Sequence, residues 1–321
     1  MIKALAPGFL LTVALGVTSF FVSTMHDTLD ALLVALLAGM LVRLLFGAQK
    51  WFVLVVAYAK DLKDVLIPIG VLLYSATINI NRSLTLPGTV YVHTLISFIV
   101  LLGVALILGK LFRLPQKTSW LTAVGSAVCG ASAIAITSTA IDAKDEDISN
   151  SMIAITLVGL LAVVLYQTPL PFFSGLDRET YAVLSGATLQ QTGMVKIATS
   201  SLGNLAKDIA LPVKVLRTAS IPFVALAFFY LTVKKEGFIK GRRYFIAVLA
   251  AFIVILGLTG LSPQFALITH LKGVKIAATI VFATAFANLG LLVDFKAMKL
   301  RPVIVALLAW VASVAVFLLM S

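Results

Sequence analysis

Charged residues are scarce in this chain of 321 residues, because Asp, Glu, Lys and Arg make up only 12% of it. An ordinary soluble domain carries about 25%. Hydrophobic residues reach 61%, which leaves too little polar surface for a protein dissolved in water. Cytosolic enzymes, nucleic-acid modules and secreted disulfide scaffolds are therefore excluded. The single cysteine, Cys129, has no intramolecular disulfide partner and indicates no redox compartment.

Motifs for metal, nucleotide or hydrolytic chemistry are also missing. The three histidines are scattered, and no metal-ligand spacing, Walker loop or zinc-protease motif occurs. We therefore expect no enzyme, no catalytic residues, no metal and no cofactor. The net charge of +12 is better explained by basic cytoplasmic loops than by a nucleic-acid partner.

Long apolar runs dominate what is present and predict an all-α integral membrane protein. A membrane-spanning helix needs about 20 mostly apolar residues, and eleven runs approach that length. They lie near residues 5–23, 29–46, 64–80, 86–109, 119–141, 148–169, 181–200, 209–232, 244–262, 274–293 and 302–320.

The distribution of basic residues predicts the orientation of these spans. With a cytoplasmic N-terminus, 17 Lys and Arg fall inside and six outside, while Lys214 and Arg217 fall within the eighth span. Arg178 counts as inside and Lys144 as outside in this arrangement. The excess of positive charge on one side favours a cytoplasmic N-terminus.

Weak internal similarities at an offset of five spans predict two inverted five-helix repeats. Glycine recurs at one depth in the second and seventh spans, Ile-Pro recurs in the third and eighth, and small residues recur in the fifth and tenth. An odd offset turns the second half upside down, as in many secondary transporters. The expected domains are an extra helix at 1–28, a first repeat at 29–170 and a second repeat at 171–321.

Small and polar residues crowd the fifth span, which runs through Gly125, Ser126, Cys129, Gly130 and Ser132. They are explained equally well by a close helix-packing face and by a broken helix whose free N–H groups bind an anion. The two explanations are compatible. We expect the fifth span and the tenth, near residues 284–288, to be discontinuous and to cross.

Lys214 and Arg217 share one helical face deep in the eighth span. They either pair with Asp208 or reach outward, or they lack a protein partner and neutralise an anionic substrate. Thr188 and Gln191 in the seventh span and Asn288 in the tenth are further candidates. These polar groups serve either helix contacts or hydrogen bonds to the substrate.

Three separated motifs then resemble the YeiH-type sulfate exporter family. They are Gly125-Ser-Ala-Val-Cys-Gly-Ala-Ser-Ala133, Ser185-Gly-Ala-Thr188 and Val213-Lys-Val-Leu-Arg217, and Asn288-Leu-Gly-Leu-Leu292 matches the family's last element. The resemblance implies an inner-membrane transporter with inverted repeats, two discontinuous crossing helices and a small sulfur oxyanion as substrate. Gln190, Gln191 and Met194 stand where that family tends to have a histidine, an acidic residue and a glutamine, so proton coupling through this segment is not implied.

The expected function is a secondary transporter, an exporter, of a small inorganic anion of the sulfate or sulfite type, working by alternating access in the lipid bilayer. The alternatives are a sodium- or proton-coupled organic-anion carrier and a non-transporting membrane scaffold or enzyme. A homodimer is left open. The predicted substrate-binding residues are Ser126, Cys129, Gly130, Ser132, Thr188, Gln191, Lys214, Arg217 and Asn288.

Overall fold

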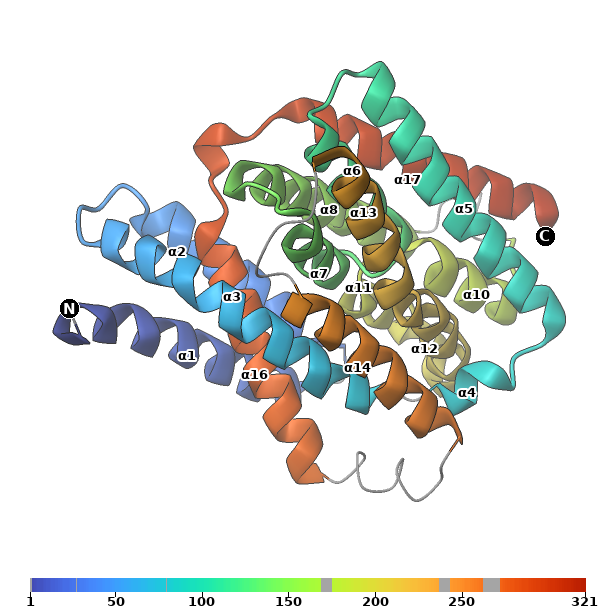
Figure 1. The fold of residues 1–321 in the computed structure, drawn as a ribbon. Coiled ribbons are helices and arrows are strands. Elements are labelled where there is room, and N and C mark those ends of the chain that lie inside the picture. Colours follow the sequence, from blue (N-terminus) through green and yellow to red (C-terminus); the bar gives the residue numbers. More distant parts are fainter. Residues whose placement is uncertain (1, 27, 79, 169–174, 237–242, 262–271) are drawn as a thin grey trace. The chain divides into compact units, whose positions relative to one another are not determined.

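Helices are the only regular elements in the part of the chain that the computed structural model describes, namely residues 2–26, 28–78, 80–168, 175–236, 243–261 and 272–321 (Figure 1). The predicted all-α membrane fold is confirmed, while the count of eleven spans stays a prediction. Within the described residues, six segments are long and apolar enough to cross a membrane. They are Gly8–Met25, Gly88–Leu111, Asp145–Gln167, Asp208–Lys235, Gly273–Leu292 and Leu300–Met320.

The chain folds into two compact units, each made of two stretches of sequence. Unit 1 comprises Met1–Ile78 and Arg242–Ala297, and unit 2 comprises Asn79–Gly241 and Met298–Ser321. These units are packing units and follow a different division from the predicted repeats at 29–170 and 171–321, which stay a prediction.

Unit 1 is built around one long helix that contacts three others. Its elements are α1 (Ile2–Met25), α2 (Ala31–Phe46), α3 (Phe52–Thr77), α14 (Arg243–Leu261), α16 (Lys272–Leu292) and η2 (Phe295–Ala297). Helix α16 packs against α1, α2 and α3. The contact with α2 is very close, because a Cβ at Gly39 would lie 2.2 Å from the Ala287 oxygen, and one at Gly290 would lie 2.4 Å from the Leu36 oxygen.

The expected break in the tenth span is wrong, because α16 is continuous from Lys272 to Leu292. Its small residues serve helix packing instead. Gly290 lies against α2, and a Cβ at Gly16 of α1 would lie 2.2 Å from Thr284 Oγ1. Small residues allow such close backbone approach without interrupting the helical hydrogen bonds.

Unit 2 contains the polar segments that the sequence marks as candidate site. Its elements are α4 (Asn81–Leu84), α5 (Gly88–Leu111), α6 (Gln116–Ala127), α7 (Ala131–Ile141), α8 (Asp145–Gln167), α10 (Arg178–Thr188), α11 (Thr192–Ala198), η1 (Ser200–Leu202), α12 (Gly203–Ala219), α13 (Ile221–Glu236) and α17 (Leu300–Met320). Helix α5 packs against α6 and α17, and α8 packs against α6 and α17.

Helices α6 and α7 form a re-entrant hairpin, hairpin A (116–141), in place of one continuous span. The break after Ala127 confirms the predicted discontinuity of the fifth span. The two ends of the hairpin lie together, because Lys117 Nζ donates a hydrogen bond to the Asp142 oxygen at 3.2 Å. The chain therefore enters and leaves hairpin A at the same end of unit 2.

The packing of α6 against α8 independently shows that hairpin A turns back on itself. Thr122 Oγ1 lies 3.2 Å from Ser151 Oγ, and a Cβ at Gly125 would lie 2.8 Å from Ile155 Cγ1. From the first of these contacts to the second, the residue number increases in both helices, so α6 and α8 are parallel. If the segment 116–141 crossed the membrane, the next helix would run antiparallel to α6.

Helices α10 and α11 form a second re-entrant hairpin, hairpin B (178–198). The Tyr181 hydroxyl donates to the Ala198 oxygen at 3.4 Å, which places the two ends of the hairpin together. A hydrogen bond of 2.5 Å from Gln167 Nε2 to the Ile197 oxygen places these ends at the C-terminal end of α8. Hairpin A lies at the N-terminal end of α8, so the two hairpins enter from opposite ends of unit 2.

These hairpins correct two side assignments. Lys144 belongs on the side of Lys117, and Arg178, at the start of hairpin B, belongs on the other side. Since one residue moves in each direction, the distribution of 17 and six basic residues is unchanged. The charge pattern therefore supports the corrected arrangement as well as it supports eleven spans.

Candidate functional site

The tips of the two hairpins meet inside unit 2. A Cβ at Gly130 of hairpin A would lie 2.5 Å from Cγ of Gln191 in hairpin B. The same tip of hairpin B lies against α8, because a Cβ at Gly159 would lie 3.2 Å from Gln190 Oε1. Since α8 runs from Asp145 to Gln167, this contact lies about two-thirds of the way along a candidate membrane span.

Backbone geometry explains why each hairpin breaks where it does. Gly130 has φ +73°, a conformation that residues with a Cβ rarely adopt, and its N–H donates to the Gly125 oxygen at 3.0 Å. In hairpin B, Leu189 and Gln191 are extended, with ψ values of 141° and 146°. Each tip therefore presents a helix C-terminus, three non-helical residues and a helix N-terminus.

Lys214 on α12 joins the two tips through main-chain oxygens. Its Nζ donates to the Val128 oxygen at 2.9 Å in hairpin A, and to the oxygens of Leu189 at 2.8 Å and Gln190 at 2.7 Å in hairpin B. An ammonium group has three N–H donors, and each one has an acceptor here. Lys214 is 1% exposed, so these bonds are made in the interior of unit 2.

Arg217 makes the same connection one helical turn later. Its Nε donates to the Ala127 oxygen at 2.7 Å and its Nη2 to the Ser126 oxygen at 2.7 Å, both in hairpin A. Its Nη1 donates to the oxygens of Ala187 at 2.6 Å and Leu189 at 3.0 Å in hairpin B. The residue is 2% exposed.

Both cations therefore bind the carbonyl ends of half-helices. The last carbonyls of α6 and α10 have no helical partner and carry partial negative charge, which a buried cation offsets. The interpretation that Lys214 and Arg217 lack protein partners is wrong, and neither pairs with Asp208, whose carboxylate binds Arg82 at 2.9 Å. Direct contact of the two cations with a substrate stays a prediction.

Unpartnered amide groups gather beside the N-terminal end of α7. Among the described residues, Gln191 Nε2 and both amide atoms of Gln190 are buried without a hydrogen-bond partner. The Gln191 side chain lies against Gly130, which is the N-cap of α7 and supplies no side-chain cap. The first N–H groups of a helix attract anions, so this arrangement can donate hydrogen bonds to a small oxyanion.

The remaining predicted residues of unit 2 lie around the same tips. Cys129 Sγ donates to Ser132 Oγ at 3.1 Å. Ser126 Oγ donates to the Thr122 oxygen. Thr188 Oγ1 lies 2.6 Å from the Tyr166 hydroxyl on α8.

Asn288, the ninth predicted residue, belongs to unit 1. Its Nδ2 donates to the Ala59 oxygen of α3 at 2.7 Å, and its Oδ1 has no hydrogen-bond partner among the described residues. Thus eight of the nine predicted residues gather in unit 2, and the ninth joins two helices of unit 1.

Two features of the site are missed by sequence reasoning. Gln190 is absent from the predicted binding residues, although its side chain is buried like that of Gln191. Tyr166 ends an apolar run and gives no signal of its contact with Thr188. The sequence signal for this tip is the pair of consecutive amides Gln190-Gln191 before Gly193. In a continuous apolar helix one of two adjacent amides would face lipid, so the pair indicates a break in the helix.

Comparison with known proteins relates this chain to membrane proteins. A family profile described as conserved hypothetical protein 698 matches residues 7–309. A UPF0324 membrane protein of Archaeoglobus fulgidus is 29% identical over 314 residues, covering 97% of this chain and 91% of the relative. A UPF0324 membrane protein of Agrobacterium fabrum is 28% identical, covering 93% and 86%. The chain belongs to the conserved hypothetical protein 698 family, the UPF0324 membrane proteins of YeiH type.

Proposed function

We propose that this membrane protein is a secondary transporter of a small inorganic anion of the sulfate or sulfite type. The observation that carries the proposal is the meeting of two re-entrant hairpins, which enter unit 2 from opposite ends and touch through Gly130 and Gln191. Broken helices that expose half-helix ends near the middle of the membrane are the usual binding sites of secondary transporters.

The balance of charge at the tips favours an anionic substrate. Lys214 and Arg217 contribute two positive charges, and the C-terminal ends of α6 and α10 contribute about −0.5 each. The N-terminal end of α7 adds about +0.5. The sum is an excess of more than one positive charge in a buried region, which a bound oxyanion would offset.

In this proposal, Gln191, Ser132 and the first N–H groups of α7 bind the anion, while Lys214 and Arg217 position the tips. Thr188, Ser126, Cys129 and Gly130 shape the same region. Alternating access exposes the tips first to one side of the membrane and then to the other. The N-terminus is placed in the cytoplasm, the protein in the inner cell membrane, and the direction is export.

A sodium- or proton-coupled carrier of organic anions is the second candidate, because the same half-helix ends bind carboxylates as well as sulfate. A membrane scaffold or an enzyme is less well supported, since neither role requires two hairpins that meet tip to tip. A homodimer is compatible with either transport function.

Transport in proteoliposomes tests the proposal. Purified protein is reconstituted, and uptake of radiolabelled sulfate is measured against unlabelled sulfite, phosphate, chloride and succinate as competitors, with and without sodium or pH gradients. We expect sulfite to compete best. Competition by succinate alone would favour the organic-anion carrier, and an absence of sulfate uptake under every gradient would contradict the proposed sulfate transport.

A further inference from the structure

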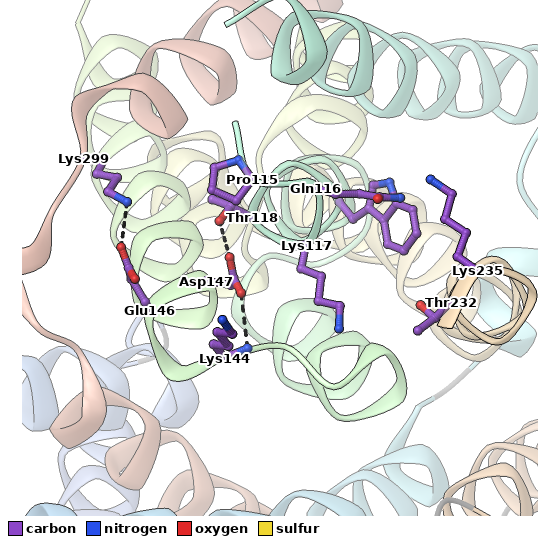
Figure 2. Close-up of a pocket in the computed structure, with 11 residues that line it drawn as sticks. Pro115, Gln116, Lys117, Thr118, Lys144, Glu146, Asp147, Thr232, Lys235 and Lys299 are labelled. Atoms are coloured by element: carbon purple, nitrogen blue, oxygen red, sulfur yellow. Dashed lines mark hydrogen bonds and ion pairs between the residues drawn. The ribbon is translucent and has the colours of Figure 1, made fainter. Parts of the chain in front are cut away.

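A second polar feature of unit 2 lies away from the hairpin tips, at the end where hairpin A begins. It is a cavity of about 320 Å³ (Figure 2). Residues of α6, α8, α13 and the start of α17 line it, four of them lysines: Lys117, Lys144, Lys235 and Lys299. The transport proposal uses none of these lysines.

The cavity lies where membrane-spanning helices end. Lys235 closes the candidate span Asp208–Lys235, Lys144 immediately precedes the span Asp145–Gln167, and Lys299 immediately precedes Leu300–Met320. Three span ends thus converge on the cavity. Its depth is therefore that of the lipid headgroups and not that of the hydrocarbon core.

The lining has an excess of positive charge. Two carboxylates, Glu146 and Asp147, face four lysines, which gives a formal charge of +2. Glu146 is paired with Lys299 at 2.7 Å. Asp147 accepts hydrogen bonds from the Thr118 hydroxyl and from the main-chain N–H of Lys144. Both carboxylates are thus engaged by protein groups, and the lining as a whole keeps a net positive charge.

An aromatic side chain accompanies the lysines. Trp120 lines the cavity, and Lys235 Nζ lies 5.9 Å from the centre of its ring. Tryptophan is typical of the membrane–water interface, where its ring lies among the headgroups. Basic pockets between membrane helices bind the phosphorylated headgroups of anionic lipids.

We propose that this cavity binds the phosphate-bearing headgroup of an anionic phospholipid, such as phosphatidylglycerol or cardiolipin. The volume exceeds that of a single phosphate and accommodates a headgroup with its glycerol. By the excess of basic residues, this end of unit 2 faces the cytoplasmic leaflet, where anionic lipids attract clustered lysines. The bound lipid would join α6, α8, α13 and α17 and so stabilise unit 2.

Trp120 supplies the reporter for the test. The variant Trp51→Phe/Trp310→Phe leaves Trp120 as the sole tryptophan of the chain. Delipidated protein in detergent is titrated with cardiolipin, and Trp120 emission and the midpoint of thermal unfolding are recorded. Phosphatidylcholine and inorganic phosphate at matched concentrations serve as separate arms. We expect saturable changes with cardiolipin and none with the other two.

The double variant Lys144→Gln/Lys235→Gln removes two positive charges from the lining. We expect it to bind cardiolipin about 30-fold more weakly, from the typical contribution of a lysine near anionic lipid. The matched control, Lys275→Gln/Lys296→Gln, makes the same change of net charge in unit 1 and should bind as the parent does.

Equal weakening in both variants would overturn the proposal, because it would mean that net charge alone attracts the lipid. An equal response to inorganic phosphate would overturn it as well, since the site would then recognise a free oxyanion. Sulfate uptake is measured in parallel, so failure of lipid binding and failure of transport are distinguished.

Discussion

Gly130 and Gln191 lie in direct contact, because a Cβ at Gly130 would be only 2.5 Å from Cγ of Gln191. This contact joins two segments that are 61 positions apart in the sequence. Glycine is required at position 130 for two reasons: a side chain would collide with Gln191, and the backbone has φ +73°. The joint between the hairpins therefore depends on the absence of one carbon atom.

The substitution Gly130→Ala should destabilise the protein. Positive φ costs a non-glycine residue about 1–3 kcal/mol, and the new Cβ must displace Gln191. We expect a lower midpoint of thermal unfolding in detergent and reduced anion uptake. Gly103→Ala is the control, because nothing lies within 4 Å of its added Cβ in α5. An unchanged midpoint for Gly130→Ala would contradict the contact between the tips.

Hairpin A predicts that residues 117 and 144 are accessible from one side of the membrane. Single cysteines at Lys117, Lys144 and Arg178 are made in a Cys129→Ser background and labelled with an impermeant maleimide in right-side-out and inverted vesicles. We expect 117 and 144 to be labelled from the same side and 178 from the opposite side. Labelling of 117 and 144 from different sides would show that the segment between them crosses the membrane.

Replacing Lys214 with methionine should loosen the joint between the hairpins. The oxygens of Val128 and Gln190 would lose the donor that Lys214 supplies, while the Leu189 oxygen would keep only Arg217. An unsatisfied buried polar group costs about 1–3 kcal/mol. We expect a clear loss of thermal stability, and the same direction for Arg217→Ala. The exposed Lys110→Met should leave stability unchanged. A stable Lys214→Met protein that has lost only anion binding would instead make the lysine a direct substrate ligand.

Gln191 should be sensitive to charge as well as to size. We expect Gln191→Glu to abolish sulfate uptake, because a carboxylate beside the N-terminal end of α7 repels the anion and occupies its donors. Gln191→Ala should retain a fraction of the uptake. Gln49→Glu, at an exposed position of unit 1, controls for the added charge. Uptake that survives Gln191→Glu would place the anion elsewhere.

Sequence composition predicts the break in hairpin A but not the use of similar residues in α16. Both segments are rich in Gly, Ala and Ser or Thr. Gly130 breaks a helix because Lys214 and Arg217 bind the carbonyls that the break releases. Gly290 lies in a continuous helix because α2 packs against it. Whether such a segment breaks or continues as a helix therefore depends on the helix packed against it, α12 for hairpin A and α2 for α16. Each of these helices comes from a distant part of the chain.

The re-entrant course of the hairpins is harder to predict, because hydropathy indicates how long an apolar segment is but not whether the chain turns back within it. Residues 119–141 are as long and apolar as a spanning helix, yet the chain turns back at Gly130. The lysines at both ends of the segment, Lys117 and Lys144, are the available signal. Two basic flanks favour one side of the membrane over two opposite sides.

The parallel course of α6 and α8 has a consequence for experiments on the chain ends. A segment that turns back is no longer counted as a crossing, and the next helix then starts from the side on which that segment entered. Two such segments reduce eleven predicted crossings by two, and both counts are odd. A reporter fused to the C-terminus would therefore give the same answer for either arrangement, and only probes placed inside the chain can distinguish them.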